Sequence, residues 1–307
     1  MFDHKSAMRK AVSAMALLVS VTGSASFAAR PLDPTDPIDN LAVEMAMGCN
    51  STDVANPQFY FWTGQVYSRR AGEPDRHIFN VQGVNPRACQ LFNDPQRGGR
   101  GYKAAARELM LYLDPVSNQA LTTWENPWTG ESVEVVPMLN DPASMRAPKF
   151  PFDAEGQAVP MRMAWQDMGE FLMASRTRPF FRDSPLGGNY QDYVGGKYQV
   201  METSTMTISK ADTMAYEPGD YIPYVATWTR LSPWLPWMKM GGRDGMIILI
   251  SQGRSALSFD DLPQPLRGAI ENDYPIMKRV PEFDDERPFT TSWDSMKQWL
   301  DAQRDGS

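Results

Sequence analysis

Residues 227–245 read TWTRLSPWLPWMKMGGRDG, and the apolar run MIILI follows at residues 246–250. The run has the length of a strand, and a β-prone segment precedes the prolines, so the stretch predicts two strands joined by a fixed corner. Large rigid aromatic surfaces beside one cation, Arg230, favour a pocket wall for a flat apolar ligand, although the same composition also fits a core. The candidate wall residues here are Trp228, Trp234, Trp237 and Met240.

Outward from this corner, a β pattern recurs along most of the chain. The turn AGEPD predicts a hairpin between its flanking segments, and the turn NPWTGE predicts a second hairpin. Residues 137–159 and 177–196 are rich in proline or glycine and predict loops. The predicted strands are residues 57–71, 76–84, 107–113, 120–124, 132–136, 160–175, 197–208, 225–231 and 245–251.

Helices are predicted near the two ends of the chain, at residues 38–47, 258–271 and 292–304. We therefore predict a mainly β fold: a large antiparallel sheet, curved or closed into a barrel of the calycin or lipocalin kind, with a few peripheral helices. The predicted organisation is a signal peptide at residues 1–28, an extended lead-in and short helix at 29–56, a β-rich domain at 57–285 and a C-terminal helix at 286–307.

The first residues have the pattern of a secretory signal. Lys5, Arg9 and Lys10 precede an apolar run at residues 11–21, and small residues lead to a cleavage site after Ala28. The run is too short for a membrane-spanning helix, which needs roughly twenty residues. We expect a periplasmic or secreted protein with no membrane span, and the sequence leaves its oligomeric state open.

Charge and cysteine content limit the partners and the compartment. The net charge of −7 argues against nucleic acid, because phosphate backbones bind positively charged surfaces. Cys49 and Cys89 are the two cysteines of the chain, and in an oxidising compartment they are either bridged or free. The spacing of the pair does not decide between these alternatives.

Several chemistries lack the residues that they need. The two histidines are His4, in the predicted signal, and His77, so no histidine cluster is available for zinc, iron or copper. A serine hydrolase would depend on His77, and no GxSxG motif accompanies it. The glycines of residues 99–104 imitate a dinucleotide fingerprint, but no βαβ unit surrounds them, and they predict a loop. We therefore expect neither metal nor cofactor.

Acid–base chemistry by side chains is the enzymatic option that fits this composition. Alternation along residues 107–113 places Arg107 on one face and Glu108 with Tyr112 on the other, so an ionisable group points inward in either case. A buried carboxyl group can act as acid or base near neutral pH, and an arginine can stabilise a developing phenolate or enolate. Glu108, Tyr112 and Arg230 are the candidates for base, acid and anion stabiliser, and a salt bridge is the structural alternative.

The candidate binding residues are aromatic, charged or methionine side chains in or beside strands and turns. Packing in the core explains the tryptophans as well as a ligand does, and stacking on a glycan is a further use of such side chains. The candidates are Trp62, Arg107, Trp128, Glu202, Trp228, Trp234, Trp237 and Met240.

Two tryptophan-rich motifs stand far apart in the chain. NPWTGE at residues 126–131 lies between ELMLYLDP and NDP, and WTR, PW, PWM and MG follow one another within residues 227–245. With TGQVYSR at residues 63–69, this order resembles the bacterial family known as domain of unknown function 1838, over roughly residues 35–285. The resemblance implies an exported β-barrel protein whose chemistry concerns small aromatic or otherwise apolar molecules.

Two functions of different class follow. The first is an exported, cofactor-independent enzyme of lyase or isomerase type that acts on a small aromatic or apolar molecule. The second is a non-catalytic periplasmic carrier for an apolar ligand, in which tryptophans line the cavity and charged residues close its ends. The enzyme hypothesis requires Glu108 or Arg107 to face an internal cavity.

Overall fold

The computed structural model describes residues 31–145, 147–161, 163–187, 190, 196–217 and 219–305. The predicted signal peptide and its cleavage site lie outside the described residues. No helix within the described ranges is long and apolar enough to cross a membrane.

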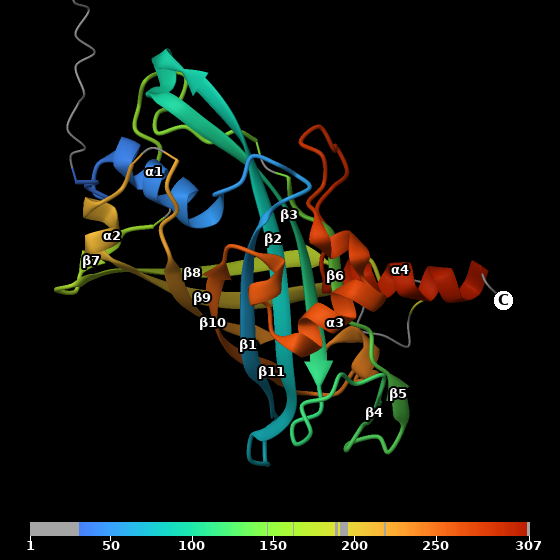
Figure 1. The fold of residues 1–307 in the computed structure, drawn as a ribbon. Helices are drawn as coiled ribbons and strands as arrows, with labels where there is room; N and C mark the ends of the chain where they lie inside the picture. The colour runs from blue at the N-terminus through green and yellow to red at the C-terminus, as the bar shows by residue number, and fades with distance from the viewer. Residues whose placement is uncertain are drawn as a thin grey trace, which may run out of the picture.

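One large antiparallel sheet dominates the fold, in the strand order β6-β3-β2-β1-β11-β10-β9-β8-β7 (Figure 1). Its strands are β1 (Gln58–Arg69), β2 (Arg76–Asp94), β3 (Gly99–Leu113), β6 (Met138–Met145), β7 (Trp165–Asp167), β8 (Phe171–Asp183), β9 (Lys197–Ser209), β10 (Tyr224–Ser232) and β11 (Met246–Ala256). A separate hairpin pairs β4 (Thr123–Glu125) with β5 (Ser132–Glu134).

Helices lie around this sheet. They are α1 (Pro37–Gly48), α2 (Lys210–Met214), α3 (Gln264–Asn272) and α4 (Ser292–Asp305), with short 3₁₀ turns at η1 (Pro95–Arg97), η3 (Pro236–Met238), η4 (Phe259–Asp261) and η5 (Pro275–Lys278). The helices predicted at residues 38–47 and 292–304 are confirmed, and the one predicted at 258–271 is a 3₁₀ turn followed by α3. Since α4 packs into the main core, it shares that core with the β-rich domain.

The sheet is curved and open. In Figure 1, β8, β9 and β10 cross steeply behind β1, β2 and β3, so the sheet bends back over itself. The strands at its two edges are β6 and β7, and no pairing joins them in the described part of the chain. The mainly β, antiparallel prediction is therefore confirmed, whereas closure into a barrel is not.

Alternation along the strands gives the sheet two different faces. On β3, Leu109 and Leu111 pack outward against Leu266 and Ile270 of α3. The alternate residues of the same strand, among them Tyr112, point to the opposite face, which we call the inner face. The inner face carries both the main aromatic core and a cavity.

The tryptophan-rich corner forms as the sequence predicts. Residues 227–245 comprise the end of β10, the turn η3 and the entry to β11, and β10 pairs with β11. Gly245 has a φ of 127°, and a Cβ there would lie 2.5 Å from the Trp234 ring. A glycine is therefore required where the chain passes beneath this indole.

Some predicted loops are strands. The loop predicted at residues 137–159 contains β6, and β8 continues through Pro179 to Asp183 into the loop predicted at 177–196. β7 pairs with β8 only at residues 172–174, so Pro179 lies where β8 has a partner on one side alone. A proline is tolerated there because its missing N–H faces no neighbouring strand. The glycine-rich residues 99–104 likewise begin β3 and are not a loop.

Candidate functional site

A cavity of about 640 Å³ occupies one part of the inner face. Strands β2, β3 and β6 line one side and β8, β9 and β10 the other, so the cavity lies within the bend of the sheet and is partly open to solvent. The second half of α1, together with residues 289–292, Lys149 and Met163, completes its lining. The residues that β8 contributes are Ala174, Arg176, Arg178, Phe180 and Arg182, which alternate along the strand as strand geometry requires.

Four of the predicted site residues meet on this lining: Glu108 from β3, Glu202 from β9, and Trp228 and Arg230 from β10. Glu202 and Arg230 are direct cross-strand partners, and Arg230 Nη1 lies 3.8 Å from Glu202 Oε1. The Nε atom of Arg230 is buried and has no hydrogen-bond partner among the described residues. This donor is therefore unsatisfied, while the rest of the Arg230 side chain, 13% exposed, lines the cavity.

Glu108 is set opposite Asn140 of β6, whose Nδ2 donates a hydrogen bond of 2.8 Å to Glu108 Oε2. Burial raises the pKa of Glu108, and the negative charge of Glu202 acts in the same direction. The hydrogen bond from Asn140 and the charges of Arg230 and Arg87 oppose that shift in pKa without cancelling it. Glu108 therefore keeps its proton to a higher pH than an exposed glutamate does.

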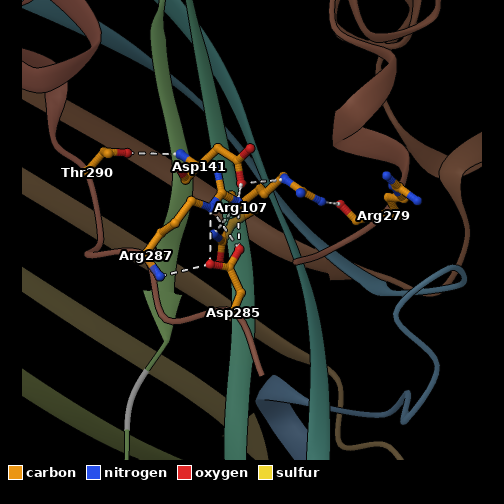
Figure 2. A network of polar contacts seen from close by, with 7 residues as sticks. Arg107, Asp141, Arg279, Asp285, Arg287 and Thr290 are labelled. Atoms are coloured by element: carbon orange, nitrogen blue, oxygen red, sulfur yellow. Dashed lines mark hydrogen bonds and ion pairs between the residues drawn. The ribbon is translucent and has the colours of Figure 1, made fainter. Parts of the chain in front are cut away.

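Arg107, the neighbour of Glu108, points to the other face of the sheet and is absent from the cavity lining. Its Nε donates to Asp141 Oδ1 at 2.8 Å and its Nη1 donates to the carbonyl oxygen of Arg279 at 2.7 Å (Figure 2). Arg287 also binds Asp141, at 3.2 Å. The structural alternative for Arg107, a buried ion pair, is the one that its position supports.

The remaining predicted residues pack in the main core, away from the cavity. Tyr112 contacts the Trp237 ring at 5.1 Å between centroids and the Phe79 ring at 5.8 Å. The rings of Tyr112, Trp237 and Phe79 pack against one another and do not line the cavity. The predicted residues outside the cavity lining are Trp62, Arg107, Tyr112, Trp128, Trp234, Trp237 and Met240.

Sequence reasoning missed several residues of the lining. Arg87 of β2 donates from Nη1 to Tyr224 Oη at 3.1 Å, and its Cζ lies 5.2 Å from the Tyr60 ring centroid. Arg178 and Arg182 project from the part of β8 that was predicted as a loop. The period-two spacing of residues 176, 178, 180 and 182 was the signal that could have identified them.

A polar cluster occupies another part of the lining. Lys149 Nζ donates to Glu44 Oε2 at 2.8 Å and to Tyr102 Oη at 2.8 Å, and Tyr102 Oη donates to Glu44 at 2.9 Å. Lys149 also lies 4.7 Å from the Tyr102 ring centroid. These three side chains pair with one another, so they close α1 against β3.

Among the residues that the structure describes, no three histidine, cysteine or carboxylate side chains gather closely enough to hold a metal ion. The expectation that the protein needs neither metal nor cofactor stays a prediction.

The chain shares sequence with two kinds of known protein. Over 75 residues, 24% of the chain, it is 33% identical to a vacuolar membrane protease of Aspergillus clavatus, and the match spans 8% of that protein. This short match covers too little of either chain to transfer an activity. A family model described as protein of unknown function (DUF1838) matches residues 55–300, and the chain belongs to that family.

Proposed function

We propose that the protein is an exported, cofactor-independent enzyme that acts on a small aromatic molecule by acid–base chemistry in the inner cavity. One observation carries the proposal: a carboxyl group of raised pKa, Glu108, shares a cavity with Arg230, whose buried Nε has no hydrogen-bond partner among the described residues. Groups with shifted pKa values in a cavity are characteristic of acid–base catalysts.

In this proposal Glu108 exchanges a proton with the substrate, and Arg230 stabilises the negative charge that develops on a substrate oxygen. Trp228 lines the same cavity and offers an aromatic surface beside them. A lyase or isomerase step requires a proton transfer of this kind and no external oxidant. The acid role predicted for Tyr112 has no support from its position, because Phe79 and Trp237 contact its ring in the core.

Export is the second part of the proposal. The signal pattern at residues 1–28 supports it, and so does the disulfide between Cys49 and Cys89, since such bonds persist in oxidising compartments.

The curved sheet with a cavity on its inner face also supports comparison with the lipocalin type of binding fold, although its edges are unpaired.

A carrier function is the alternative. The position of Tyr112 in the core, outside the cavity lining, favours it. In a carrier, the Glu108–Asn140 and Arg230–Glu202 pairs would only orient the ligand, which would leave the cavity chemically unchanged. The two functions share the cavity and differ in whether Glu108 transfers a proton.

The experiment that separates them screens small aromatic molecules for quenching of tryptophan fluorescence and then analyses each bound compound by mass spectrometry. If a compound is converted, Glu108→Gln and Arg230→Ala should each lower kcat by about two orders of magnitude. Glu134→Gln, at an exposed position on β5, is the matched control and should leave turnover unchanged. Binding without conversion would support the carrier, and full turnover in both cavity variants would exclude the proposed roles.

A further inference from the structure

We propose that the ligand of the cavity is a small aromatic anion whose acidic group binds at Arg178 and Arg182 of β8. The proposal rests on the proposed function only in taking this cavity as the ligand site. It specifies that the ligand carries a negative charge, whereas the sequence predicted only an apolar or aromatic ligand.

The net charge of the cavity lining is opposite in sign to that of the whole protein. The whole chain has 37 acidic and 30 basic residues, yet the lining of the cavity has six basic side chains and three acidic ones. The basic residues are Arg87, Lys149, Arg176, Arg178, Arg182 and Arg230, and the acidic ones are Glu44, Glu108 and Glu202. A positive cavity in a negative protein concentrates small anions.

The acidic groups of the lining do not neutralise this charge. Glu44 pairs with Lys149, and Glu202 pairs with Arg230. Burial raises the pKa of Glu108, which favours its neutral form. Neither Arg178 nor Arg182 has a carboxylate partner among the described residues. Arg178 contacts the Phe180 ring, and Arg182 contacts the rings of Phe180 and Phe289.

Aromatic contacts position both guanidinium groups. The Phe180 ring centroid lies 5.8 Å from Arg178 Cζ and 5.4 Å from Arg182 Cζ. The Phe289 ring centroid lies 4.4 Å from Arg182 Cζ. Such cation–π contacts hold an arginine in place and leave its N–H groups free to donate. The planar donors of a guanidinium match the oxygens of a carboxylate or sulfonate.

Strand register places this pair beside the proposed catalytic groups. Arg178 lies directly opposite Glu202, which lies directly opposite Arg230 on the next strand, so the three form one row across the inner face. An anion at Arg178 would therefore bring an attached ring toward Trp228 and Arg230 on β10. The cavity volume of about 640 Å³ suits a molecule of one or a few rings, and the net charge of −7 opposes the approach of a large polyanion.

Two fluorescent probes of similar shape test the inference: 8-anilinonaphthalene-1-sulfonate, an anion, and N-phenyl-1-naphthylamine, its neutral analogue. Both are titrated into the full mature protein. We expect the anion to bind the wild type more tightly, and the Arg178→Gln/Arg182→Gln double variant to lose about tenfold or more of that affinity. Affinity for the neutral probe should stay within about twofold. Arg254→Gln, which removes a cation over the Phe61 ring outside the cavity lining, is the control for loss of an arginine elsewhere and should change neither.

Salt provides a second measurement that needs no variant. Raising NaCl from about 50 to about 500 mM should weaken binding of the anion and not of the neutral probe, because screening acts on charge. Equal affinities of the two probes, or anion binding that is insensitive to both salt and the double variant, would overturn the inference and leave the cavity as a neutral binding site. Failure of both probes to bind would overturn the proposed function as well.

Discussion

Arg107 and Glu108 are adjacent on β3, yet their side chains have different roles because they point to opposite faces of the sheet. Arg107 points outward and is neutralised by Asp141, whereas Glu108 points into the cavity and accepts a hydrogen bond from neutral Asn140. A neutral donor offsets less of the cost of burying a carboxylate than a cation would. The raised pKa of Glu108 is therefore a consequence of its partner as well as of its burial.

Glu108 should make the stability of the protein depend on pH. An unfolded chain releases this proton near its ordinary pKa of 4.5, while the folded protein retains it to higher pH because burial raises the pKa. The stability that this retained proton contributes is fully present below the pKa of Glu108 in the unfolded chain. It is lost as the pH rises through the pKa of Glu108 in the folded protein. We expect Glu108→Gln to gain stability relative to the wild type as the pH is raised, as measured by urea denaturation at about pH 4 and about pH 8.

The exposed Glu134→Gln variant should show no such trend. A difference between Glu108→Gln and the wild type that stays constant with pH would contradict the assigned pKa direction.

Gly83 is a residue at which the core leaves no room for a side chain. It lies opposite Trp62 in the β1–β2 pairing, and a Cβ would come within 2.1 Å of the indole ring. Trp62 is 4% exposed and cannot swing away, so Gly83→Ala should destabilise the protein by about 1–3 kcal/mol. Gly268→Ala in α3, where nothing lies within 4 Å, should instead stabilise it by about 0.5–1 kcal/mol. Urea denaturation of both variants tests the contrast, and equal effects would contradict it.

Among the elements, the pairing of β3 with β6 fixes the catalytic candidate in place. The register shifts between Ala106 and Glu108, and after the shift Asn140 stands opposite Glu108. The next residue of β6, Asp141, binds Arg107 on the outer side, and its N–H donates to Thr290 Oγ1 (Figure 2). The Arg107–Asp141 pair therefore ties β3, β6 and the segment before α4 together behind the cavity.

Asp141→Asn should test how much this pair contributes to stability. It leaves the Arg107 guanidinium, which is 5% exposed, without its carboxylate, and removal of one partner from a buried pair costs about 3 kcal/mol or more. Arg287→Ala removes an arginine that binds the same carboxylate but is 53% exposed, so it should cost at most about 1 kcal/mol. A free energy of unfolding that is equally affected by both substitutions would contradict this difference in burial.

The elements predicted from the sequence are those whose pattern is local. Alternating apolar residues and turn motifs identified β1, β9, β10 and both hairpins, and a serine cap with apolar spacing identified α4. Proline misled the prediction at β6 and β8, because whether a proline fits a strand depends on the neighbouring strand and not on the local sequence. Because the second half of β8 was predicted as a loop, Arg178 and Arg182 were not predicted as site residues.

The placement of the tryptophans shows the same limit for the site. Strand alternation correctly put Glu108 and Tyr112 on one face, but it could not tell that the face is filled with aromatic rings at Tyr112 and hollow at Glu108. That division depends on how the whole sheet bends, which is set by contacts between distant strands. Arg230 does line the cavity, and its catalytic role stays a prediction; the signal for it was a cation beside tryptophans, which requires a polar environment.

For the whole molecule, the bend of the sheet creates the cavity, and α1 closes part of it. Met47, Gly48 and Cys49, at the end of α1, contribute to the lining. Cys49 is joined by a disulfide to Cys89 of β2, 40 residues later in the chain. A covalent link thus holds one boundary of the cavity against the sheet.

Removal of this link should affect both stability and binding. The Cys49→Ser/Cys89→Ser variant should lose about 2–4 kcal/mol of unfolding free energy, because the unfolded chain regains the freedom of a 40-residue loop. The freed end of α1 should also weaken binding of N-phenyl-1-naphthylamine, and dithiothreitol should produce both effects in the wild type but neither in the variant. Since the rest of α1 stays anchored by Glu44, which accepts hydrogen bonds from Lys149 and Tyr102, the fold itself should persist. A variant with unchanged stability and unchanged probe affinity would show that packing alone holds α1 at the cavity.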